Sequence, residues 1–215
     1  MRAIVKGQEP QSLTEHRRTP HSDYDNYPDR GTLRRALVAE QRGLCCYCMG
    51  RIRPRENAMK IEHWQCQRHH QDKQLNYRNL LGACLGSEGQ PFRSQQCDTR
   101  KGDNELLWNP AEPAHAIEAR VQYGADGTIR SSNATFDNQL NQVLNLNLAI
   151  LKTNRKQTLD VVLEWWKEEK AKRRGPVPRE RIEREVCKHA PAQGQLAPYR
   201  QVAVWWLQQR LARIP

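Results

Sequence analysis

The residues that decide the fold of this chain are Ile61-Glu62-His63-Trp64, then Asn79, then Cys97-Asp98-Thr99-Arg100-Lys101-Gly102. Cysteines interleave with them, as Cys45-Cys46-Tyr47-Cys48 upstream and as Cys84 between the second and third elements. An acidic residue next to a histidine, a separate asparagine, and an aspartate close to a lysine are what a one-metal phosphodiester-cleaving site requires. The sequence therefore indicates a chemistry before it indicates a fold.

Four of the cysteines have the spacing of a structural zinc site. Cys45 and Cys48 are separated by two residues, and a turn of that length points both thiolates inward. The second pair would be Cys84 and Cys97, which are separated by a longer stretch rich in Gly, Ser and Gln. This stretch can loop out at little cost, because closure entropy grows only slowly with length. We predict that all four cysteines bind Zn²⁺, the alternative being a set of reduced core thiols.

His63 and Asn79 are candidates for proton transfer. The imidazole of His63 has an unperturbed pKa of about 6.5, which suits a general base that draws a proton from water. If Asn79 lies across a hairpin from His63, its amide could fix the imidazole tautomer with one hydrogen bond. The alternative is that His63 and Asn79 are each an ordinary polar residue of a loop.

Two carboxylates and two cations complete the candidate site. Glu62 and Asp98 supply hard oxygen ligands of the kind that Mg²⁺ or Mn²⁺ prefers. A cation held there would stabilise the leaving 3′ oxygen and the charge on the phosphoryl group. Arg100 and Lys101 follow Asp98 within one short turn, so both are predicted to contact phosphate.

The charge of the chain favours a polyanionic partner. The sequence has 35 Lys and Arg against 24 Asp and Glu, a net charge of +11. The excess is concentrated in residues 151–215, where 15 basic residues face 7 acidic ones and leave +8. Such a surface would bind nucleic acid in a salt-dependent way. A basic composition without a specific partner is the alternative.

The sequence gives no sign of membrane insertion or export. No stretch approaches the roughly 18 apolar residues of a membrane span, and residues 1–6 do not read as a signal peptide. We therefore expect no membrane partner and a cytoplasmic location. Cysteines in a reducing compartment favour metal ligation or free thiols over disulfides.

The pattern of elements predicts an α+β chain that is mostly helical. A short helix is expected over Leu33–Gln41, strands over Met59–Trp64 and from Leu80 toward Cys84, and a short helix or tight turn over Cys97–Glu105. Apolar residues recur at helical spacing from Leu140 to Leu151 and again from Leu159. The expected organisation is an irregular lead-in (1–31), a core module with the zinc and candidate catalytic residues (32–112), and a helical C-terminal region (113–215) with a hinge at 172–178 and a last helix over Tyr199–Ala212.

Two features of the helical region suggest contacts with other molecules. Trp205 falls nearly opposite the apolar stripe of its helix, so it could dock a partner or pack on the core module of its own chain. The basic run Lys167–Arg174 could follow a phosphate backbone, although Glu168 and Glu169 interrupt it. A solvated helix end, where cations favour the helix dipole, is the alternative.

The motifs resemble those of the HNH, or ββα-metal, nucleases. The matching residues are Cys45-x-x-Cys48, Glu62-His63, Asn79-Leu80, Cys84 and Cys97-Asp98-x-x-Lys101-Gly102. The resemblance implies that His63 is the general base, Asn79 the middle asparagine and Glu62 the metal ligand before the base. Asp98 takes the place of the closing histidine or asparagine. A small zinc-supported ββα-metal module with a helical extension is therefore expected.

A closer resemblance, to the PtuB family, covers nearly the whole chain. The matching stretches are residues 1–7, 10–13, 41–49, 60–64 and 144–147. PtuB is the HNH subunit of the Septu anti-phage system and also occurs beside some retrons. The resemblance implies a partner, the ATPase PtuA, which forms a complex with the nuclease and restrains it until infection.

We therefore expect a metal-dependent endonuclease that cleaves DNA within an anti-phage defence complex. RNA such as host tRNA is an alternative substrate, because such a site grips a phosphodiester and reads no base. A zinc-stabilised module that binds nucleic acid or protein without cleaving is an alternative of another class. That alternative gives Glu62, His63, Asn79 and Asp98 no shared reason to be present.

Overall fold

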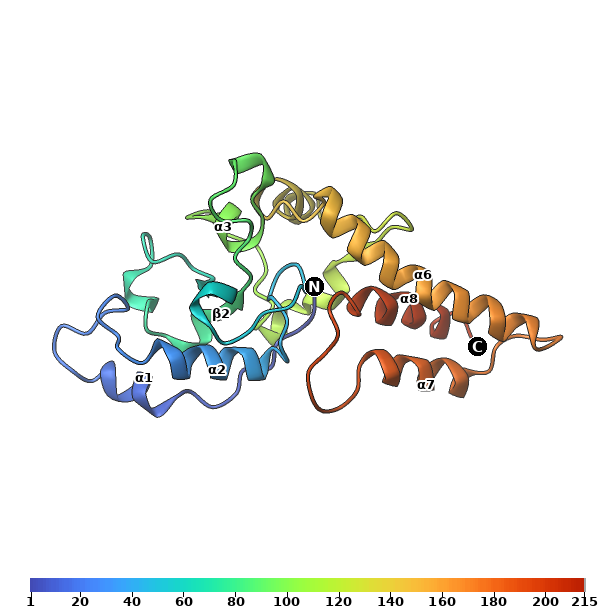
Figure 1. Ribbon diagram of the computed structural model, residues 1–215, viewed down its shortest axis with the longest axis horizontal. Helices are drawn as coiled ribbons and strands as arrows, with labels where there is room; N and C mark the ends of the chain where they lie inside the picture. Colours follow the sequence, from blue (N-terminus) through green and yellow to red (C-terminus); the bar gives the residue numbers. More distant parts are fainter. Residues whose placement is uncertain (215) are drawn as a thin grey trace.

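The chain folds into an α+β structure, which the computed structural model describes over residues 1–214 (Figure 1). Within these residues the strands form two antiparallel sheets of two strands each. The α-helices and β-strands are α1 (Gln11–His16), α2 (Arg30–Glu40), β1 (Lys60–His63), β2 (Leu80–Ala83), α3 (Cys97–Lys101), α4 (Ile117–Arg120), β3 (Gln122–Tyr123), β4 (Ile129–Arg130), α5 (Ala134–Asn138), α6 (Ala149–Ala171), α7 (Arg179–His189) and α8 (Gln201–Leu211). The α+β, mostly helical class expected from the sequence is confirmed.

The β1–β2 hairpin is the platform of the candidate site. Its register pairs Glu62 with Leu81 and His63 with Leu80, and both leucines are fully buried. Helix α2 packs against β2. It begins where the Asp29 carboxylate accepts the N–H of Thr32, which satisfies one of the free amides of the first turn. The expected short helix and both expected strands are present, with ends shifted by a few residues.

A closed loop leads from β2 to α3. Its two ends are joined by a hydrogen bond from the Gln96 N–H to the Gly86 carbonyl oxygen (2.9 Å). Gly86 has a φ of +59°, and a Cβ at this position would meet the Gln96 oxygen at 2.1 Å. Only glycine fits so close an approach. The loop that the sequence predicts between Cys84 and Cys97 therefore forms.

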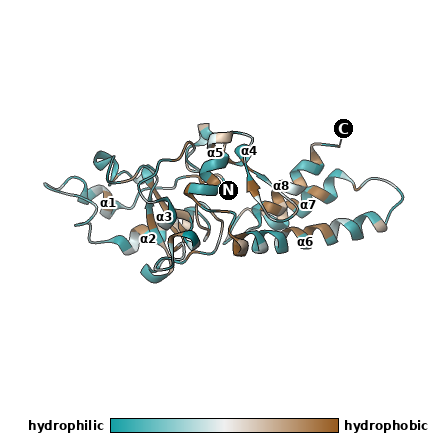
Figure 2. Cartoon of the chain, turned by 90° about the horizontal axis from the view of Figure 1, so that it is seen from above, coloured by the Kyte–Doolittle hydropathy of each residue, from teal (hydrophilic) through white to brown (hydrophobic). Residues whose placement is uncertain are grey.

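Helices α6, α7 and α8 make up the opposite end of the molecule (Figures 1 and 2). Helix α8 packs on both α6 and α7. Trp166 of α6 meets Trp206 of α8 edge-on, with 5.5 Å between ring centroids. Trp205 meets Tyr123 of β3 at 5.7 Å, so it packs within its own chain. No helix in residues 1–214, α6 included, has both the length and the apolarity needed to cross a membrane.

The helix expected from Leu140 to Leu151 is interrupted. Residues 139–143 form one π-helical segment, and α6 begins only at Ala149. Between them Asn145 has a φ of +50°. Its amide nitrogen donates to the carbonyl oxygens of Arg93 (3.0 Å) and Gln95 (2.8 Å), so this segment bonds to the loop before α3 instead of continuing the helix. Periodicity alone does not reveal such a long-range contact.

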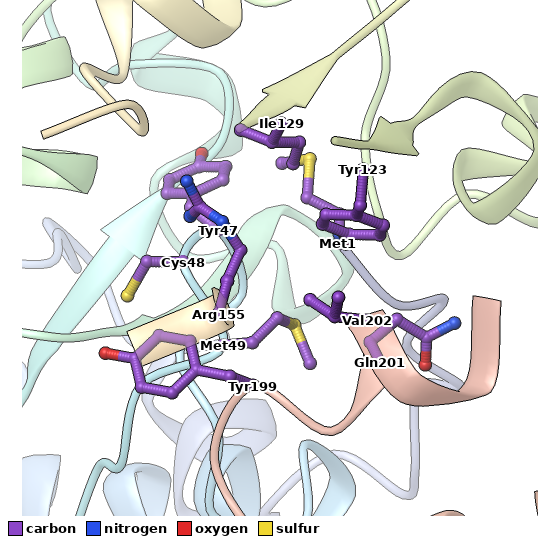
Figure 3. A pocket seen from close by; sticks show the side chains of 10 residues that line it. All are labelled: Met1, Tyr47, Cys48, Met49, Tyr123, Ile129, Arg155, Tyr199, Gln201 and Val202. Carbon is purple, nitrogen blue, oxygen red and sulfur yellow. The ribbon is translucent and has the colours of Figure 1, made fainter. Parts of the chain in front are cut away.

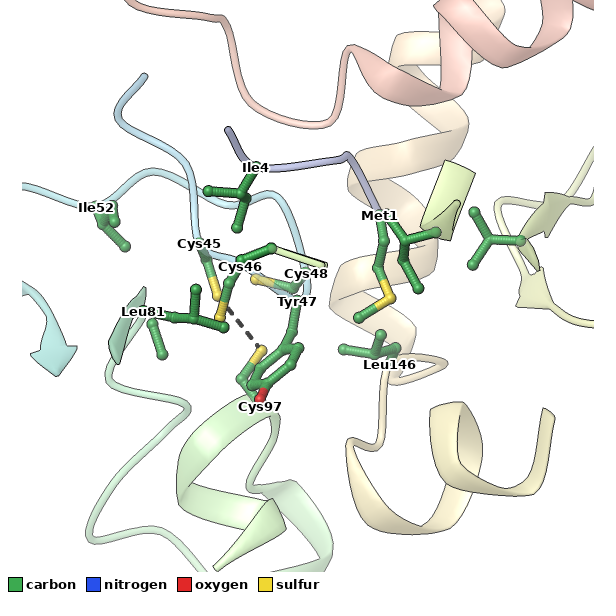
Figure 4. Packing of buried hydrophobic residues seen from close by; sticks show 14 of the residues in the cluster. Met1, Ile4, Cys45, Cys46, Tyr47, Cys48, Ile52, Leu81, Cys97 and Leu146 are labelled. Carbon is green, nitrogen blue, oxygen red and sulfur yellow. Dashed lines mark hydrogen bonds between the residues drawn. The ribbon is translucent and has the colours of Figure 1, made fainter. Parts of the chain in front are cut away.

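Four helices, α1, α4, α5 and α7, have no counterpart among the individual helices expected from the sequence. The lead-in contains α1, in which Leu13 is fully buried. Helix α7 follows the hinge, inside the region expected to be helical but at a place where no individual helix was expected. One hydrophobic cluster includes Leu13 together with Leu81 of β2, Phe136 of α5 and Leu207 of α8. The lead-in, the core module and the helical region therefore share buried surface, part of which Figure 4 shows around the cysteines.

Arg155 of α6 is a buried cation within this shared core, with 2% of its surface exposed. Its Nε donates to the Gly127 carbonyl oxygen (2.6 Å) and an Nη donates to the Leu146 carbonyl oxygen (2.7 Å). Figure 3 shows its side chain among those of Tyr47 and Tyr199. Arg155 therefore ties α6 to the β3–β4 turn and to the segment that precedes the helix.

The turn between α6 and α7 depends on Glu169, whose side chain is 3% exposed and lies 2.7 Å from Arg181 and 3.1 Å from Arg173. The hydrogen bonds from Arg181, followed by those of its neighbours, lower the pKa of Glu169 to about 2. We expect Glu169→Gln to lower Tm by several degrees, because it removes the charge that both guanidinium groups share. Glu164→Gln, an exposed residue beside Lys167, should change Tm little.

Thermal unfolding followed by circular dichroism measures both variants. Because the folded pKa of Glu169 lies below its unfolded value, its contribution is complete above that unfolded value and is lost as the pH falls toward 2. The difference in Tm between wild type and Glu169→Gln should therefore shrink in acid. A difference independent of pH would contradict this assignment.

Candidate metal centres and catalytic site

Four cysteine side chains converge on one point in the core. The Sγ atoms of Cys45, Cys48, Cys84 and Cys97 all lie within 4.8 Å of one another. Those of Cys45 and Cys97 are 3.8 Å apart, the pair marked in Figure 4, and those of Cys48 and Cys84 are 3.7 Å apart. Four sulfurs at about 2.3 Å from a tetrahedral zinc ion would be about 3.8 Å from each other. The cluster could therefore hold a metal such as zinc, as the sequence predicts.

Three separate segments deliver these ligands. Cys45 and Cys48 lie on a turn closed by a hydrogen bond from the Met49 N–H to the Cys45 carbonyl oxygen (3.2 Å). Cys84 directly follows β2, and Cys97 is the first residue of α3. A metal ion at this point would tie the turn, the hairpin and α3 together.

Arg155 lies close enough to the cysteines for the two groups to influence each other electrostatically. Burial lowers the pKa of Arg155, and negative charge on Cys48 and Cys97 opposes that effect. Four thiolates around a divalent ion leave an excess of negative charge. The buried guanidinium is therefore placed where it offsets that excess.

Glu62 is the most deeply buried carboxylate of the candidate catalytic site, with 1% of its side chain exposed. The Tyr47 hydroxyl donates to its Oε1 (2.6 Å), and the Lys101 Nζ lies 2.9 Å from the same atom. Burial and, next, the negative charge of Asp98 raise the pKa of Glu62 well above its usual value. Two neighbouring carboxyl groups thus share a confined space, an arrangement that a bound cation would stabilise.

Asp98 is the more accessible of the two carboxylates. It follows Cys97 on α3, its side chain is 21% exposed, and Lys60 Nζ lies 3.7 Å from its Oδ2. Mg²⁺ and Mn²⁺ take oxygen ligands, and Mg²⁺ commonly uses one or two protein carboxylates while it keeps several waters. The donor set of Glu62 and Asp98 therefore fits such a cation.

His63 is buried and oriented by the main chain. It is 7% exposed, and its Nε2 lies 3.0 Å from the carbonyl oxygen of Gln74. Because a carbonyl oxygen can only accept, Nε2 carries the proton and Nδ1 is the basic nitrogen. Tyr24 packs edge-on against the ring, with 4.5 Å between centroids. Burial lowers the pKa of His63 to about 4, so the imidazole is neutral at pH 7, as a general base must be.

Asn79 does not perform the role expected for it. Its Oδ1 accepts from the Gln65 N–H (2.8 Å), and its Nδ2 donates to the carbonyl oxygens of Gln65 (3.0 Å) and Lys73 (3.2 Å). The hairpin register places Leu80, not Asn79, opposite His63, and successive side chains of a strand point to opposite faces. Asn79 therefore holds in place the loop that contains Lys73 and Gln74, and the carbonyl oxygen of Gln74 orients the imidazole.

The prediction that Lys101 contacts phosphate is also corrected, whereas the same prediction for Arg100 stays a prediction. Lys101 is 1% exposed, and its Nζ donates to the His63 carbonyl oxygen (3.0 Å) besides pairing with Glu62. Arg100 lies over the Phe92 ring at 3.6 Å and donates to the Phe92 carbonyl oxygen (2.6 Å). Lys101 therefore supports the site from inside, whereas Arg100 is half-exposed and uses only its Nε and one Nη within the protein.

Three contributors to the site escape sequence reasoning. Tyr47 lies between Cys45 and Cys48 of the cysteine cluster, and that position is the one signal that could have suggested its contact with Glu62. Gln74 acts through its carbonyl oxygen, for which no residue type is diagnostic. Tyr24 reaches His63 from the lead-in, a segment that no motif connects with the site.

Comparison with protein-family models found no match, and comparison with curated proteins found none either. The site is therefore interpreted from its own geometry.

We expect the purified protein to contain about one zinc ion per chain. Cys84→Ser should lose that ion and unfold at a lower temperature, because structural zinc contributes folding free energy. Cys187→Ser, at an exposed cysteine outside the cluster, is the matched control. Elemental analysis and thermal unfolding with and without a chelator test this, and full zinc content in Cys84→Ser would rule the site out.

Lys101→Met should destabilise the fold by about 3–5 kcal/mol, because it leaves the buried Glu62 carboxylate without its cation. Lys60→Met, at a lysine whose side chain is 28% exposed, should cost much less. Urea unfolding gives both values. Unchanged stability of Lys101→Met, with a weaker salt dependence of nucleic-acid binding, would restore the phosphate role.

Proposed function

We propose that this chain is a metal-dependent HNH endonuclease that hydrolyses phosphodiester bonds, with DNA as the substrate. In this proposal β1, β2 and α3 form the ββα-metal core, and the four cysteines bind zinc to support it. The order of hairpin, loop and short helix supports the proposal. The observation that carries it is the pair of carboxylates, Glu62 and Asp98, gathered beside a neutral histidine.

The residues of the chain divide the reaction between them. A divalent Mg²⁺ or Mn²⁺ held by Glu62 and Asp98 would stabilise negative charge on the phosphoryl group and on the leaving oxygen. Nδ1 of His63 accepts a proton from a water molecule, whose oxygen forms the new bond to phosphorus. The bond from phosphorus to the 3′ oxygen breaks, and that oxygen takes a proton from solvent. The Gln74 carbonyl favours the protonated imidazole by accepting from Nε2 throughout.

Lys101 and Tyr47 keep the buried carboxylate in place for this reaction. Both bond to the same oxygen of Glu62, which leaves its second oxygen for a cation. Lys101 also holds the carbonyl of His63, so the metal ligand and the base move as one unit. This rigidity suits a site in which the base and the phosphate must keep a fixed separation.

The cellular role follows from the resemblance to the PtuB family. In this proposal the nuclease is the effector of a bacterial anti-phage complex with a PtuA-like ATPase in the cytoplasm. The net charge of +11 supports a nucleic-acid substrate, because phosphate neutralisation is the main source of affinity for such polymers.

His63→Ala should lower cleavage in Mg²⁺ or Mn²⁺ by about a hundredfold to ten-thousandfold, since it removes the general base. His69→Ala, at an exposed histidine on the loop that follows β1, is the control and should cleave normally. Duplex DNA and total tRNA are offered separately. Cleavage confined to tRNA would redirect the function to RNA, and equal activity of wild type and His63→Ala would refute the mechanism.

The defence role has its own test. Cells that express this chain with a PtuA-like ATPase should resist phage, and cells with the His63→Ala chain should not. Efficiency of plating measures the difference, and the His69→Ala chain should protect like wild type. Equal protection by the His63→Ala chain would separate defence from cleavage.

A further inference from the structure

A polar cavity lies beside the candidate catalytic site and takes no part in the proposed chemistry. Its volume is about 180 Å³. It lies between the loop that joins β1 to β2 and the segment around Asn109, and the residues that matter below are Trp64, Gln65, Asn76, Arg78, Asn109 and Glu112. Trp64 directly follows His63 in the sequence.

Three side-chain amides in the cavity wall have the same orientation, in which the oxygen of each bonds to the protein. Their oxygens accept from donors of the protein: Gln65 from Lys73 Nζ (2.9 Å), Asn76 from the Arg78 N–H (3.0 Å) and Asn109 from the Ala111 N–H (2.8 Å). Because each partner can only donate, each amide oxygen is fixed as the acceptor. The three amide nitrogens remain as donors to the cavity.

The indole of Trp64 and the guanidinium of Arg78 border the same space. The Trp64 Nε1 is buried and has no acceptor within residues 1–214, which costs free energy, and a ligand would recover that cost only if the indole turned its N–H toward the cavity. Arg78 is exposed and adds a positive charge. Asn109 is only 8% exposed, so this part of the wall is built into the fold rather than being a mobile surface.

The chemistry of the wall selects the ligand. Several N–H donors and a cation favour an anion rich in acceptor atoms, and a nucleotide has both phosphate oxygens and acceptors on its base. The indole offers a surface for a base, and the Glu112 carboxylate at the cavity can accept from an exocyclic amino group. We propose that this cavity binds one nucleotide.

The cavity is connected to the catalytic histidine. Asn79, which also lines it, bonds to the Lys73 carbonyl, one residue before the carbonyl that orients His63. We take the nucleotide to be a unit of the strand being cut, an assignment that rests on the proposed nuclease function. Its binding sets the position of the strand relative to His63 and gives the cleavage a base preference.

The test measures binding separately from cleavage. Each of the four nucleoside monophosphates, a short single-stranded DNA and inorganic phosphate are titrated by calorimetry into the zinc-containing protein, with Ca²⁺ in place of Mg²⁺. Monophosphates contain no phosphodiester, so their binding is independent of catalysis. Arg78→Ala and Asn109→Asp should each weaken binding by about tenfold, since each removes a donor to a charged ligand. Asn109→Asp keeps the acceptor for the Ala111 N–H.

Arg18→Ala is the matched control, because it removes the same charge from an exposed turn outside the cavity. Loss of monophosphate affinity in Arg78→Ala but not in Arg18→Ala supports the pocket. Loss confined to the DNA strand also supports it and identifies the strand as the source of the nucleotide. Equal affinities of Arg78→Ala and Arg18→Ala for every ligand, or inorganic phosphate bound as tightly as the nucleotides, would overturn it. Loss of cleavage in His63→Ala tests the nuclease function separately, so that function would survive a failure of the pocket.

Discussion

The peptide bond between Cys97 and Asp98 is the constraint on which the rest of the site depends. Cys97 belongs to the sulfur cluster, and Asp98 belongs to the carboxylate pair. Tyr47 makes a second bridge, because it lies between two cluster cysteines and donates to Glu62. Whatever fixes the four sulfurs therefore fixes both carboxylates, and the small hairpin needs little core of its own.

Electrostatic balance explains why so many charges are buried in so small a core. Glu62 and Asp98 crowd each other, and Lys101 offsets part of their charge from inside. In the same way, Arg155 offsets negative charge on the cysteine cluster. Each cluster thus has one buried cation from the protein, and in the proposed function metal ions would supply the rest of the charge balance.

The sequence predicts this site where the signals are local. The spacing of Cys45 and Cys48 and the adjacency of Glu62 and His63 are read directly, and the loop back to Cys97 follows from its composition. It fails where one segment acts on another. Lys101 resembles a surface lysine until Glu62 is known to lie against it, and the helix break at Asn145 comes from a loop fifty residues earlier.

The loop between β1 and β2 is built so that it tolerates substitutions of its exposed residues. Asn79 holds that loop through main-chain atoms of Gln65 and Lys73, and His63 is oriented by a main-chain oxygen of Gln74. These main-chain groups stay in place when the side chains of the loop are substituted. The exposed positions of this loop can therefore diverge freely between related chains, and alter what is recognised, while the imidazole keeps its orientation.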